Sequence, residues 1–568
     1  MESNSFEHTD RIQEIAEREA GDEESREFRI FGPPGTGKTT NVTRQIGRAV
    51  DRYGPEGVLV TSFSRAAATE LAGRDLPIAG DRIGTLHSHC WHALGGPEIA
   101  ESQVDEWNRD NPHLAITPVK KHGKLHGEES AEEDAGATGK SGDELLQQLG
   151  RYRGMMCDRR LWPATLIEFE KRWAEYKQEN GLLDFTDLIA VCLRDVHAAP
   201  KTPSVIFADE AQDLNAMQLN LVRKWGNRAE YFIIAGDDDQ TIYAFTGATP
   251  DAFLDPDIPA DHKIILKQSY RVPRAVHGLA DKLIHQVGRR QEKVYLPRAE
   301  QGEVIRLTYG TYRSPDAFIL NSAMEHLERG KSVMFLTACS YMLTPLIVAL
   351  RKNAVPFHNP YRKGNGSWNP LRLGKPESTP SRILSLLVAH PDYGEDHRPW
   401  THGDLALWAD WLQAKGILKH GAKKRLGAYT ADREATYEQL EEVFETGALE
   451  SLVAAYGRGS GDLLDWWRSR VTADVHQRVQ FPVEIAARRG AQALSVTPKV
   501  VVGTIHSVKG GQADVVYLFP DLSQAGDAQY RRGGAPHDSV IRVFYVGATR
   551  ARETLYICQR ASGMAIGI

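Results

Sequence analysis

The stretch that decides the fold is FRIFGPPGTGKTT, from Phe28 to Thr40. A short apolar run leads into a glycine-rich turn, and a segment with helical periodicity follows. Residues 32–39 match G-x-x-x-x-G-K-[ST] between an expected strand and an expected helix, which is the context that phosphate binding requires. Backbone N–H groups would surround a phosphate, Lys38 would reach its oxygens and the Thr39 hydroxyl would ligate Mg²⁺. The predicted phosphate site comprises Gly32, Pro33, Pro34, Gly35, Thr36, Gly37, Lys38, Thr39 and Thr40.

A second, acidic motif follows another apolar run. SVIFADEAQD at residues 204–213 puts Asp209 at the end of an expected buried strand and Glu210 next to it. Asp209 can hold Mg²⁺ and Glu210 can deprotonate water, so the pair favours hydrolysis over transfer to a substrate hydroxyl. The sequence has no N-K-x-D motif to recognise guanine. The two motifs together predict a hydrolase that uses ATP and Mg²⁺.

Short β-branched runs recur in two sets along the chain. They are residues 28–32, 57–63, 204–210 and 231–237, then 331–337, 499–504 and 514–520. Runs that are apolar on both faces are typical of parallel strands covered by helices. We therefore expect an α/β protein with two parallel-sheet cores. Residues 96–183 and 361–491 lack such runs and carry helical patterns, which predicts a mainly helical insertion in each core.

The composition is that of an ordinary globular chain. Of 568 residues, 41% are hydrophobic and 25% are charged, and the net charge is -6, so any surface for nucleic acid must be a local groove. The first 25 residues are charged throughout and no apolar stretch reaches 18 residues, which predicts a cytoplasmic protein without membrane spans. The five cysteines are too widely spaced for a zinc or iron–sulfur motif.

An ordered series of further motifs resembles the superfamily 1 helicases of the UvrD/Rep/PcrA type. After the phosphate-binding loop come VTSFSRAAATEL (60–71), GTLHSHCWHAL (84–94), DEAQDLNAMQ (209–218), GDDDQTIYAFTGA (236–248), LKQSYR (266–271), VVGTIHSVKGGQADVVYL (501–518) and VFYVGATRARETLYI (543–557). The resemblance implies two P-loop motor cores of the RecA-like kind, each interrupted by a helical insertion. The expected units are core 1A at 1–95 and 184–280, insertion 1B at 96–183, core 2A at 281–360 and 492–568, and insertion 2B at 361–491.

The resemblance also implies roles around ATP, which would lie between the two cores. Gln240 matches the γ-phosphate sensor, and Arg271 and Arg550 match the two arginines that approach the γ-phosphate, where a guanidinium stabilises developing charge. These three join Lys38 and Glu210 as the expected catalytic residues. Tyr270 matches the aromatic residue that stacks on adenine. For the glutamine that reads the adenine edge, Gln13 is the upstream candidate.

Single-stranded DNA would cross the tops of both cores, where aromatic side chains stack on bases whatever the sequence. The family's DNA track is matched by Phe63, His87, Tyr243, Phe245, Thr504 and His506. Basic clusters at 119–126 and 418–425 could contact duplex phosphates or could be solvated loops.

Several positions depart from the family pattern. Ala244 and Thr246 replace two arginines, and Phe245 replaces the usual tryptophan, which predicts weaker or differently distributed contact with the strand. Gly511 and Gln512 replace a hydrophobic residue and a glutamate, so that an amide stands where a carboxylate is usual.

The expected function is an ATP-dependent helicase and translocase that moves 3′-to-5′ along single-stranded DNA and unwinds duplex DNA in replication, repair or recombination. Its expected partners are single-stranded DNA, single-strand/duplex junctions and accessory replication or repair proteins, in a bacterial cytoplasm or encoded by a phage. Three alternatives stay open: a translocase that displaces proteins from DNA, a 5′-to-3′ enzyme, and a catalytically weak DNA-binding module. The phosphate-loop sequence GPPGTGKT is common in helicases of the 5′-to-3′ branch, whereas the sequences GTLHS and YVGATRA favour the UvrD type.

Overall fold

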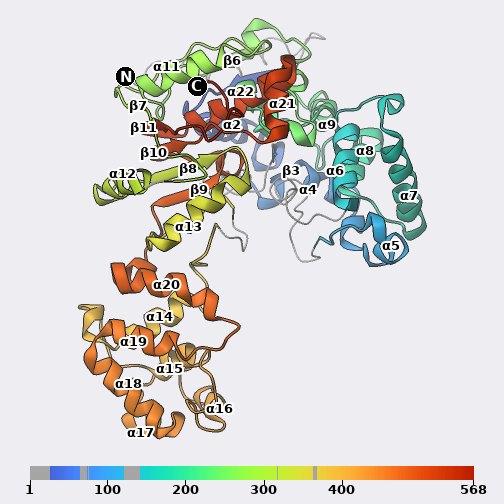
Figure 1. Ribbon diagram of the computed structural model, residues 1–568. Helices are drawn as coiled ribbons and strands as arrows, with labels where there is room; N and C mark the ends of the chain where they lie inside the picture. Colours follow the sequence, from blue (N-terminus) through green and yellow to red (C-terminus); the bar gives the residue numbers. More distant parts are fainter. Residues whose placement is uncertain (1–25, 64–72, 74–75, 120–140, 316, 363–367) are drawn as a thin grey trace.

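Two parallel sheets form the centre of the molecule (Figure 1). The computed structural model describes residues 26–63, 73, 76–119, 141–315, 317–362 and 368–568. Within them the first sheet has six strands in the order β3-β2-β4-β5-β1-β6, all paired in parallel. The strands are β1 (Glu27–Phe31), β2 (Val58–Ser62), β3 (Ile83–Thr85), β4 (Val205–Asp209), β5 (Tyr231–Gly236) and β6 (Lys263–Ile265).

Both faces of the first sheet are covered by helices. In β1, β2, β4 and β5 every residue is buried, as the continuous apolar runs predict. Alternate residues pack on α2 (Lys38–Tyr53) on one face, and on α4 (Leu86–Ala93), α8 (Phe185–Asp195), α9 (Ala216–Gly226) and α10 (Pro250–Leu254) on the other. Because β4, β5 and β1 are neighbours, the loops at residues 32–40, 209–213 and 237–240 meet at one edge of the sheet.

The second sheet has five described strands in the order β7-β11-β10-β8-β9, again all parallel. Its strands are β7 (Glu303–Arg306), β8 (Val333–Thr337), β9 (Val500–Thr504), β10 (Ala513–Leu518) and β11 (Ala551–Ile557). The surrounding helices are α11 (Arg274–Ile284), α12 (Ala317–Glu328), α13 (Thr344–Lys352), α21 (Gln524–Arg532) and α22 (Gly534–Ala548). The α/β class with two parallel-sheet cores, expected from the sequence, is therefore confirmed.

Helix α11 shows where the chain leaves the first core. Val276, Ala280 and Ile284 are buried with residues of β8, β10 and α22, so the whole helix packs on the second sheet. The expected boundary at residue 280 falls inside this helix. The packing of α11 favours a boundary before residue 274 instead.

The first insertion has a small hydrophobic core of its own. Its helices are α5 (Asp105–Asp110), α6 (Ser141–Gly154) and α7 (Ala164–Asn180). Trp107 and Trp173 are fully buried there, with ring centroids 5.1 Å apart in an edge-to-face arrangement. These helices lie together beside the first core in Figure 1. The predicted basic cluster at 119–126 lies outside the described residues, except for Val119.

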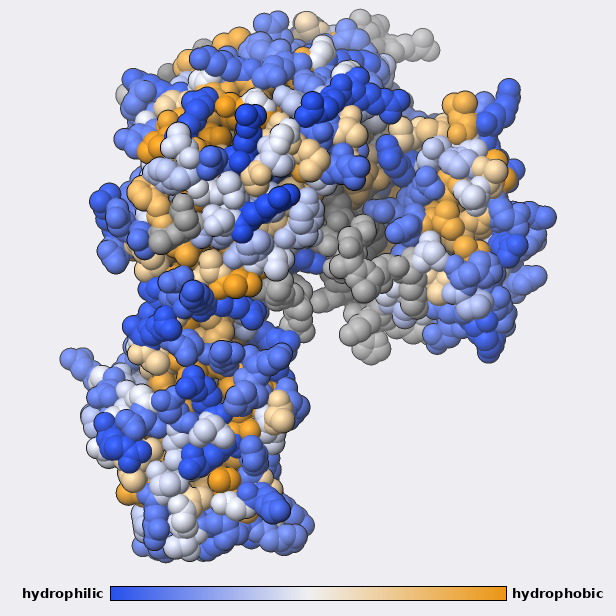
Figure 2. All heavy atoms as spheres, in the orientation of Figure 1, coloured by the Kyte–Doolittle hydropathy of each residue, from blue (hydrophilic) through white to orange (hydrophobic). Residues whose placement is uncertain are grey.

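The second insertion forms a lobe of helices below the second core in Figure 1. They are α14 (Thr379–Leu387), α15 (His402–Ala409), α16 (Ala422–Leu426), α17 (Tyr437–Val443), α18 (Thr446–Arg458), α19 (Ser460–Arg468) and α20 (His476–Arg489). Its buried residues continue into one face of the second sheet as a single cluster. The visible face of this lobe is mostly hydrophilic (Figure 2), as expected of helices that turn their apolar residues inward.

Trp467 provides a test of that shared core. Its side chain is fully buried and its Nε1 donates to the Trp408 carbonyl oxygen at 2.9 Å. Trp467→Ala should lower the free energy of unfolding by about 3–5 kcal/mol, since it opens a cavity and leaves that carbonyl unpaired. Val453→Ala, at a site that is 48% exposed on the same lobe, should change it by less than about 0.5 kcal/mol. Urea denaturation measures both, and equal effects would contradict this account.

Candidate functional site

The glycine-rich loop between β1 and α2 has the backbone that phosphate binding needs. Gly35 and Gly37 have φ of 74° and 75°, in the left-handed region that favours glycine. A Cβ at Gly35 would also lie 2.4 Å from Cβ of Arg271. Thr36 Oγ1 donates to the Pro33 carbonyl at 2.8 Å, and α2 begins at Lys38. The loop therefore precedes a helix N-terminus that is free to face an anion.

Lys38 is held by the two acidic residues that end β4. Its Nζ lies 2.9 Å from Asp209 Oδ1 and 2.5 Å from Glu210 Oε1. Burial would raise the pKa of Glu210, but Lys38 and then Lys509 outweigh it and bring that pKa to about 2. Burial raises the pKa of Asp209 despite Lys38. Glu210 itself has φ of 53°, a strained conformation for a residue other than glycine.

Gln240 connects the turn after β5 to the second core. Its Nε2 donates to Asp237 Oδ2 at 2.7 Å, and its Oε1 accepts from Arg550 Nη2 at 3.2 Å. Arg550 is 1% exposed, and burial followed by the nearby Arg271 lowers its pKa to about 9. The structure thus brings the side chains of Gln240 and Arg550, predicted from separate motifs, into direct contact.

The LKQSYR motif lies against the phosphate loop. The Tyr270 N–H donates to the Gly35 carbonyl at 2.8 Å, while the Tyr270 side chain is 70% exposed. Arg271 Nε donates to Gln512 Oε1 at 3.0 Å, and burial lowers the pKa of Arg271. The exposed ring of Tyr270 is therefore available as a stacking surface beside the loop. Thr40 is exposed on the first turn of α2, and Gln13 lies outside the described residues.

Three residues of this cleft were missed by sequence reasoning. Gln212 Nε2 donates to Glu210 Oε2 at 2.6 Å, and Lys509 Nζ donates to the Gln240 carbonyl at 2.9 Å and pairs with Asp213. Gln212 lies in the motif DEAQDLNAMQ and Lys509 in VVGTIHSVKGGQADVVYL. Their places in these motifs could therefore have identified them as candidate site residues. Tyr361 had no such signal.

The ring of Tyr361 takes up the space beside Gly511. A Cβ at Gly511 would lie 2.5 Å from Tyr361 Cζ. The glycine in place of the family's hydrophobic residue therefore makes room for an aromatic ring from a distant part of the chain. Tyr361 is 42% exposed, so part of the ring remains accessible to solvent.

The predicted DNA-contacting residues form one group and one outlier. Tyr243 contacts Phe63, Phe245 and His506, with ring centroids 5.2, 5.7 and 6.2 Å away. Phe63 is only 6% exposed, so it supports Tyr243 from beneath. Thr504 is buried and its Oγ1 accepts from the Ser507 N–H at 3.2 Å. His87 lies apart on α4, edge-to-face with Phe185 at 6.3 Å.

A cavity of about 310 Å³ opens beside this aromatic group. It is lined by Phe245 and, from α6, by Glu144, Leu145, Gln147, Gln148 and Arg151. The first insertion therefore contributes polar side chains next to the predicted DNA track.

The basic cluster at 418–425 is divided between structural and exposed residues. Arg425 donates to the carbonyl oxygens of His420 and Glu442 at 2.9 and 2.7 Å. The side chain of Lys424 is exposed. Arg425 therefore stabilises the loop, whereas Lys423 and Lys424 are both exposed, with Lys423 donating to the Asp410 carbonyl.

His506 gives a prediction about pH. Its Nε2 lies 3.2 Å from the Ile242 carbonyl, and burial lowers its pKa to about 4. Because an unfolded histidine titrates near pH 6.5, its stabilising contribution is present above that pH and is lost as the pH falls toward 4. The free energy of unfolding of His506→Gln should therefore decline less between pH 6.5 and 4 than that of the wild type. His285→Gln, at an exposed site, is the control, and parallel curves for all three proteins would refute the assignment.

Comparisons with known proteins agree with this geometry. Residues 14–258 match the UvrD/REP helicase N-terminal domain and residues 499–558 match the UvrD-like helicase C-terminal domain. The chain is 26% identical to the ATP-dependent DNA helicase PcrA of Staphylococcus aureus (strain MRSA252), over 95% of this chain and 82% of that protein. It is 23% identical to the putative ATP-dependent DNA helicase YjcD of Bacillus subtilis (strain 168), over 57% of this chain and 44% of that protein.

Among the described residues, no helix has the length and apolarity to cross a membrane, and no cluster of three or more potential metal ligands occurs.

Two domain models match in their family order, and a relative aligns along nearly the whole chain. The matched segments contain the phosphate loop, the acidic pair, Gln240 and Arg550, which the structure gathers in one cleft. The chain belongs to the UvrD/REP family of superfamily 1 helicases.

Proposed function

We propose that this protein hydrolyses ATP to move along single-stranded DNA in the 3′-to-5′ direction and to unwind duplex DNA. The observation that carries the proposal is the contact between Gln240 of the first core and Arg550 of the second, next to Lys38 and Glu210. A site assembled from two cores can hydrolyse only when they are together, which couples chemistry to motion. The relatives named above support ATP and DNA as the substrates.

The proposed domain division follows the packing. Core 1A and core 2A are each interrupted, by 1B at about residues 96–183 and by 2B at 361–491, with the change from 1A to 2A before α11. Hydrophobic clusters support the division, since α5 to α7 have a core of their own.

In the proposed mechanism the residues of the loop hold the triphosphate. The Thr39 hydroxyl and the Asp209 carboxylate are oxygen donors of the kind that Mg²⁺ prefers, and the ion would neutralise phosphate charge. Lys38, which contacts Asp209 and Glu210 here, would turn to the phosphate oxygens. Its departure removes the charge that keeps the pKa of Glu210 low, so Glu210 becomes a better base for water.

Arg550 and Arg271 would stabilise negative charge on the transferred group. Burial lowers the pKa of both arginines. Arg271 donates to Gln512, and Arg550 donates to Gln240 and to the Val546 and Gly511 carbonyls, so among the described contacts neither guanidinium forms an ion pair with a carboxylate that would neutralise it before an anion binds. Gln240 would place Arg550, and Tyr270 would stack on the base.

Lys509 links the nucleotide side of the cleft to the DNA side. Its Nζ donates to the Gln240 carbonyl and also lies 5.1 Å from the centre of the Tyr243 ring. A change in the position of Gln240 therefore moves the cation that supports an aromatic residue of the DNA track. Phe245 and the polar residues of α6 would contact the same strand.

Lys38 provides the first test. Lys38→Ala should lower the DNA-stimulated ATPase rate by about 100-fold or more, because the phosphate charge loses its lysine partner. Lys331→Ala, which removes a half-exposed lysine paired with Glu553 on the second core, should leave the rate unchanged. Unchanged turnover in the Lys38 variant would reject the assignment of the site.

The direction of movement is tested with the purified wild type on 3′-tailed, 5′-tailed and blunt duplexes. Displacement on the 3′-tailed substrate is expected, and a preference for the 5′-tailed one would reject the polarity.

The alanine and threonine at 244 and 246 favour one rival, a translocase that removes proteins from DNA and unwinds poorly. Fast ATPase and release of a protein block from single-stranded DNA, without strand displacement, would support that rival.

A further inference from the structure

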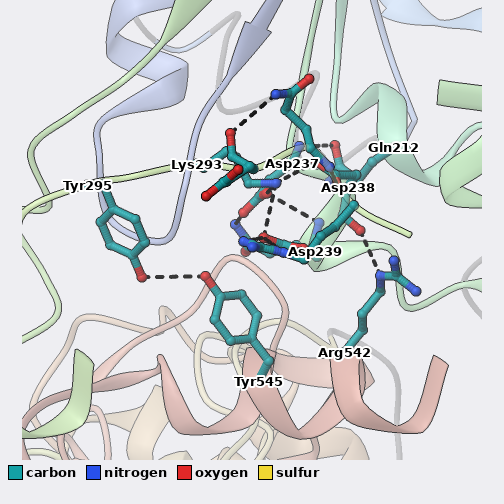
Figure 3. A network of polar contacts seen from close by, with 12 residues as sticks. Gln212, Asp237, Asp238, Asp239, Lys293, Tyr295, Arg542 and Tyr545 are labelled. Carbon is teal, nitrogen blue, oxygen red and sulfur yellow. Dashed lines mark hydrogen bonds and ion pairs between the residues drawn. The ribbon is translucent and has the colours of Figure 1, made fainter. Parts of the chain in front are cut away.

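A buried lysine joins residues 288–295, which follow α11 and are called the connector here, to the turn that carries Gln240 (Figure 3). Lys293 Nζ lies 3.1, 2.5 and 3.0 Å from carboxylate oxygens of Asp237, Asp238 and Asp239. The lysine side chain is 1% exposed and the three aspartates are fully buried. Arg290 adds a second cation by pairing with Asp239 at 2.7 Å. Three buried carboxylates in a row are thus held by two cations from a segment outside the first core.

The same turn places the side chain of Gln240. Asp237 uses Oδ1 to contact Lys293 and Oδ2 to accept from Gln240 Nε2 at 2.7 Å. This contact leaves Gln240 Oε1 facing Arg550. The orientation of the glutamine amide therefore depends on which atom of residue 237 it meets.

Asp237 is also connected to Glu210. Its backbone N–H donates to Gln212 Oε1 at 3.1 Å, and Gln212 Nε2 donates to Glu210 Oε2 at 2.6 Å. A continuous series of hydrogen bonds thus joins Glu210 to Arg550 through Gln212, Asp237 and Gln240. Burial raises the pKa of Asp237 to about 6, and Lys293 opposes that rise, which favours the carboxylate form.

The connector is attached to the second core as well. Arg542 of α22 donates to the carbonyl oxygens of Asp238 and Arg289 at 3.0 and 2.7 Å. The hydroxyls of Tyr295 and Tyr545 lie 3.4 Å apart (Figure 3), and the Gly288 N–H donates to Asp538 at 3.0 Å. Residues 288–295 are therefore bonded to the aspartate turn on one side and to α22 on the other.

We propose that Lys293 is a positioning residue for hydrolysis: it transmits the position of the second core to Asp237, and through Asp237 it sets the amide of Gln240 toward Arg550. The inference rests on the proposed function, in which Gln240 and Arg550 serve ATP hydrolysis. Lys293 has no contact with the phosphate loop among those described, so it acts through Gln240.

The test is steady-state ATPase kinetics of the full chain, with and without single-stranded DNA. Lys293→Met keeps the length of the side chain and removes its charge. We expect kcat to fall about tenfold or more, with KM for ATP and the affinity for DNA within about twofold of the wild type. In a Gln240→Ala background, Lys293→Met should cause no further loss, because the lysine acts through that glutamine. Multiplying losses would overturn the proposal.

Lys177→Met is the matched control. Lys177 is also a buried lysine that bridges two carboxylates, Asp184 and Asp187, at the base of the first insertion. Thermal unfolding reports the stability of each variant. A loss of kcat in Lys177→Met as large as that in Lys293→Met would show that a buried ion pair anywhere has this effect, and would overturn the proposal.

A second variant covers the case in which Lys293→Met does not fold. Asp237→Asn brings the cluster to two carboxylates and two cations, so the buried charge is balanced. If the introduced amide turns its oxygen to Lys293, its NH₂ group faces Gln240 and forces the glutamine amide to rotate away from Arg550. The expected result is the same fall in kcat, and an unchanged kcat would overturn the proposal.

A wild type whose ATPase rate is not stimulated by DNA would contradict the proposed function instead. The variants would then be compared with the wild type in the absence of DNA.

Discussion

The carboxyl edge of the first sheet holds more buried acid than the first core neutralises. The buried Asp209 ends β4, the partly exposed Glu210 and the buried Asp213 come after it, and the buried aspartates at 237–239 follow β5. Among the described contacts, Lys38 is the cation that the first core itself supplies to these groups. The others come from elsewhere and are Arg290 and Lys293 of the connector and Lys509 of the second core. Since buried charges need partners, this edge is complete only with the second core in place.

That constraint links the proposed nucleotide site to the contact between the two cores. Lys509 reaches Asp213 and the Gln240 carbonyl from the second core, so separation of the cores would leave these acceptors without it. An anion between the cores would offer Lys38 and Arg550 other partners. In the proposed function that anion would compete with Asp209, Glu210 and Gln240 for these two cations, and the competition would couple occupation of the site to movement of the cores.

The sequence predicted the parts of the fold that depend on strong local patterns. The phosphate loop, Asp209 and Glu210 follow fully buried strands, whose apolar runs are easy to recognise. Four strands gave no such run: β3 and β6 have three residues each, β7 is partly exposed, and β11 contains Arg552 and Glu553. Lys293 and Tyr361 could not be predicted, because their partners are distant in sequence and nothing local marks a lysine or tyrosine as buried or cleft-facing. Within the predicted helical insertion at 361–491, α17 and α18 are separate helices because Phe444 and Glu445 between them are extended.

Gln512 shows how a departure from the family pattern acts through charge. Its amide oxygen accepts from Arg271 Nε at 3.0 Å, as a glutamate oxygen could. A glutamate would also neutralise Arg271, whereas the amide holds the guanidinium in place and leaves its charge uncompensated. Burial already lowers the pKa of both Arg271 and Arg550, so their charges are costly until an anion enters. In the proposed function the glutamine therefore keeps a hydrogen bond to Arg271 and makes the site more positive than a glutamate would, which would favour a highly charged triphosphate over an empty site.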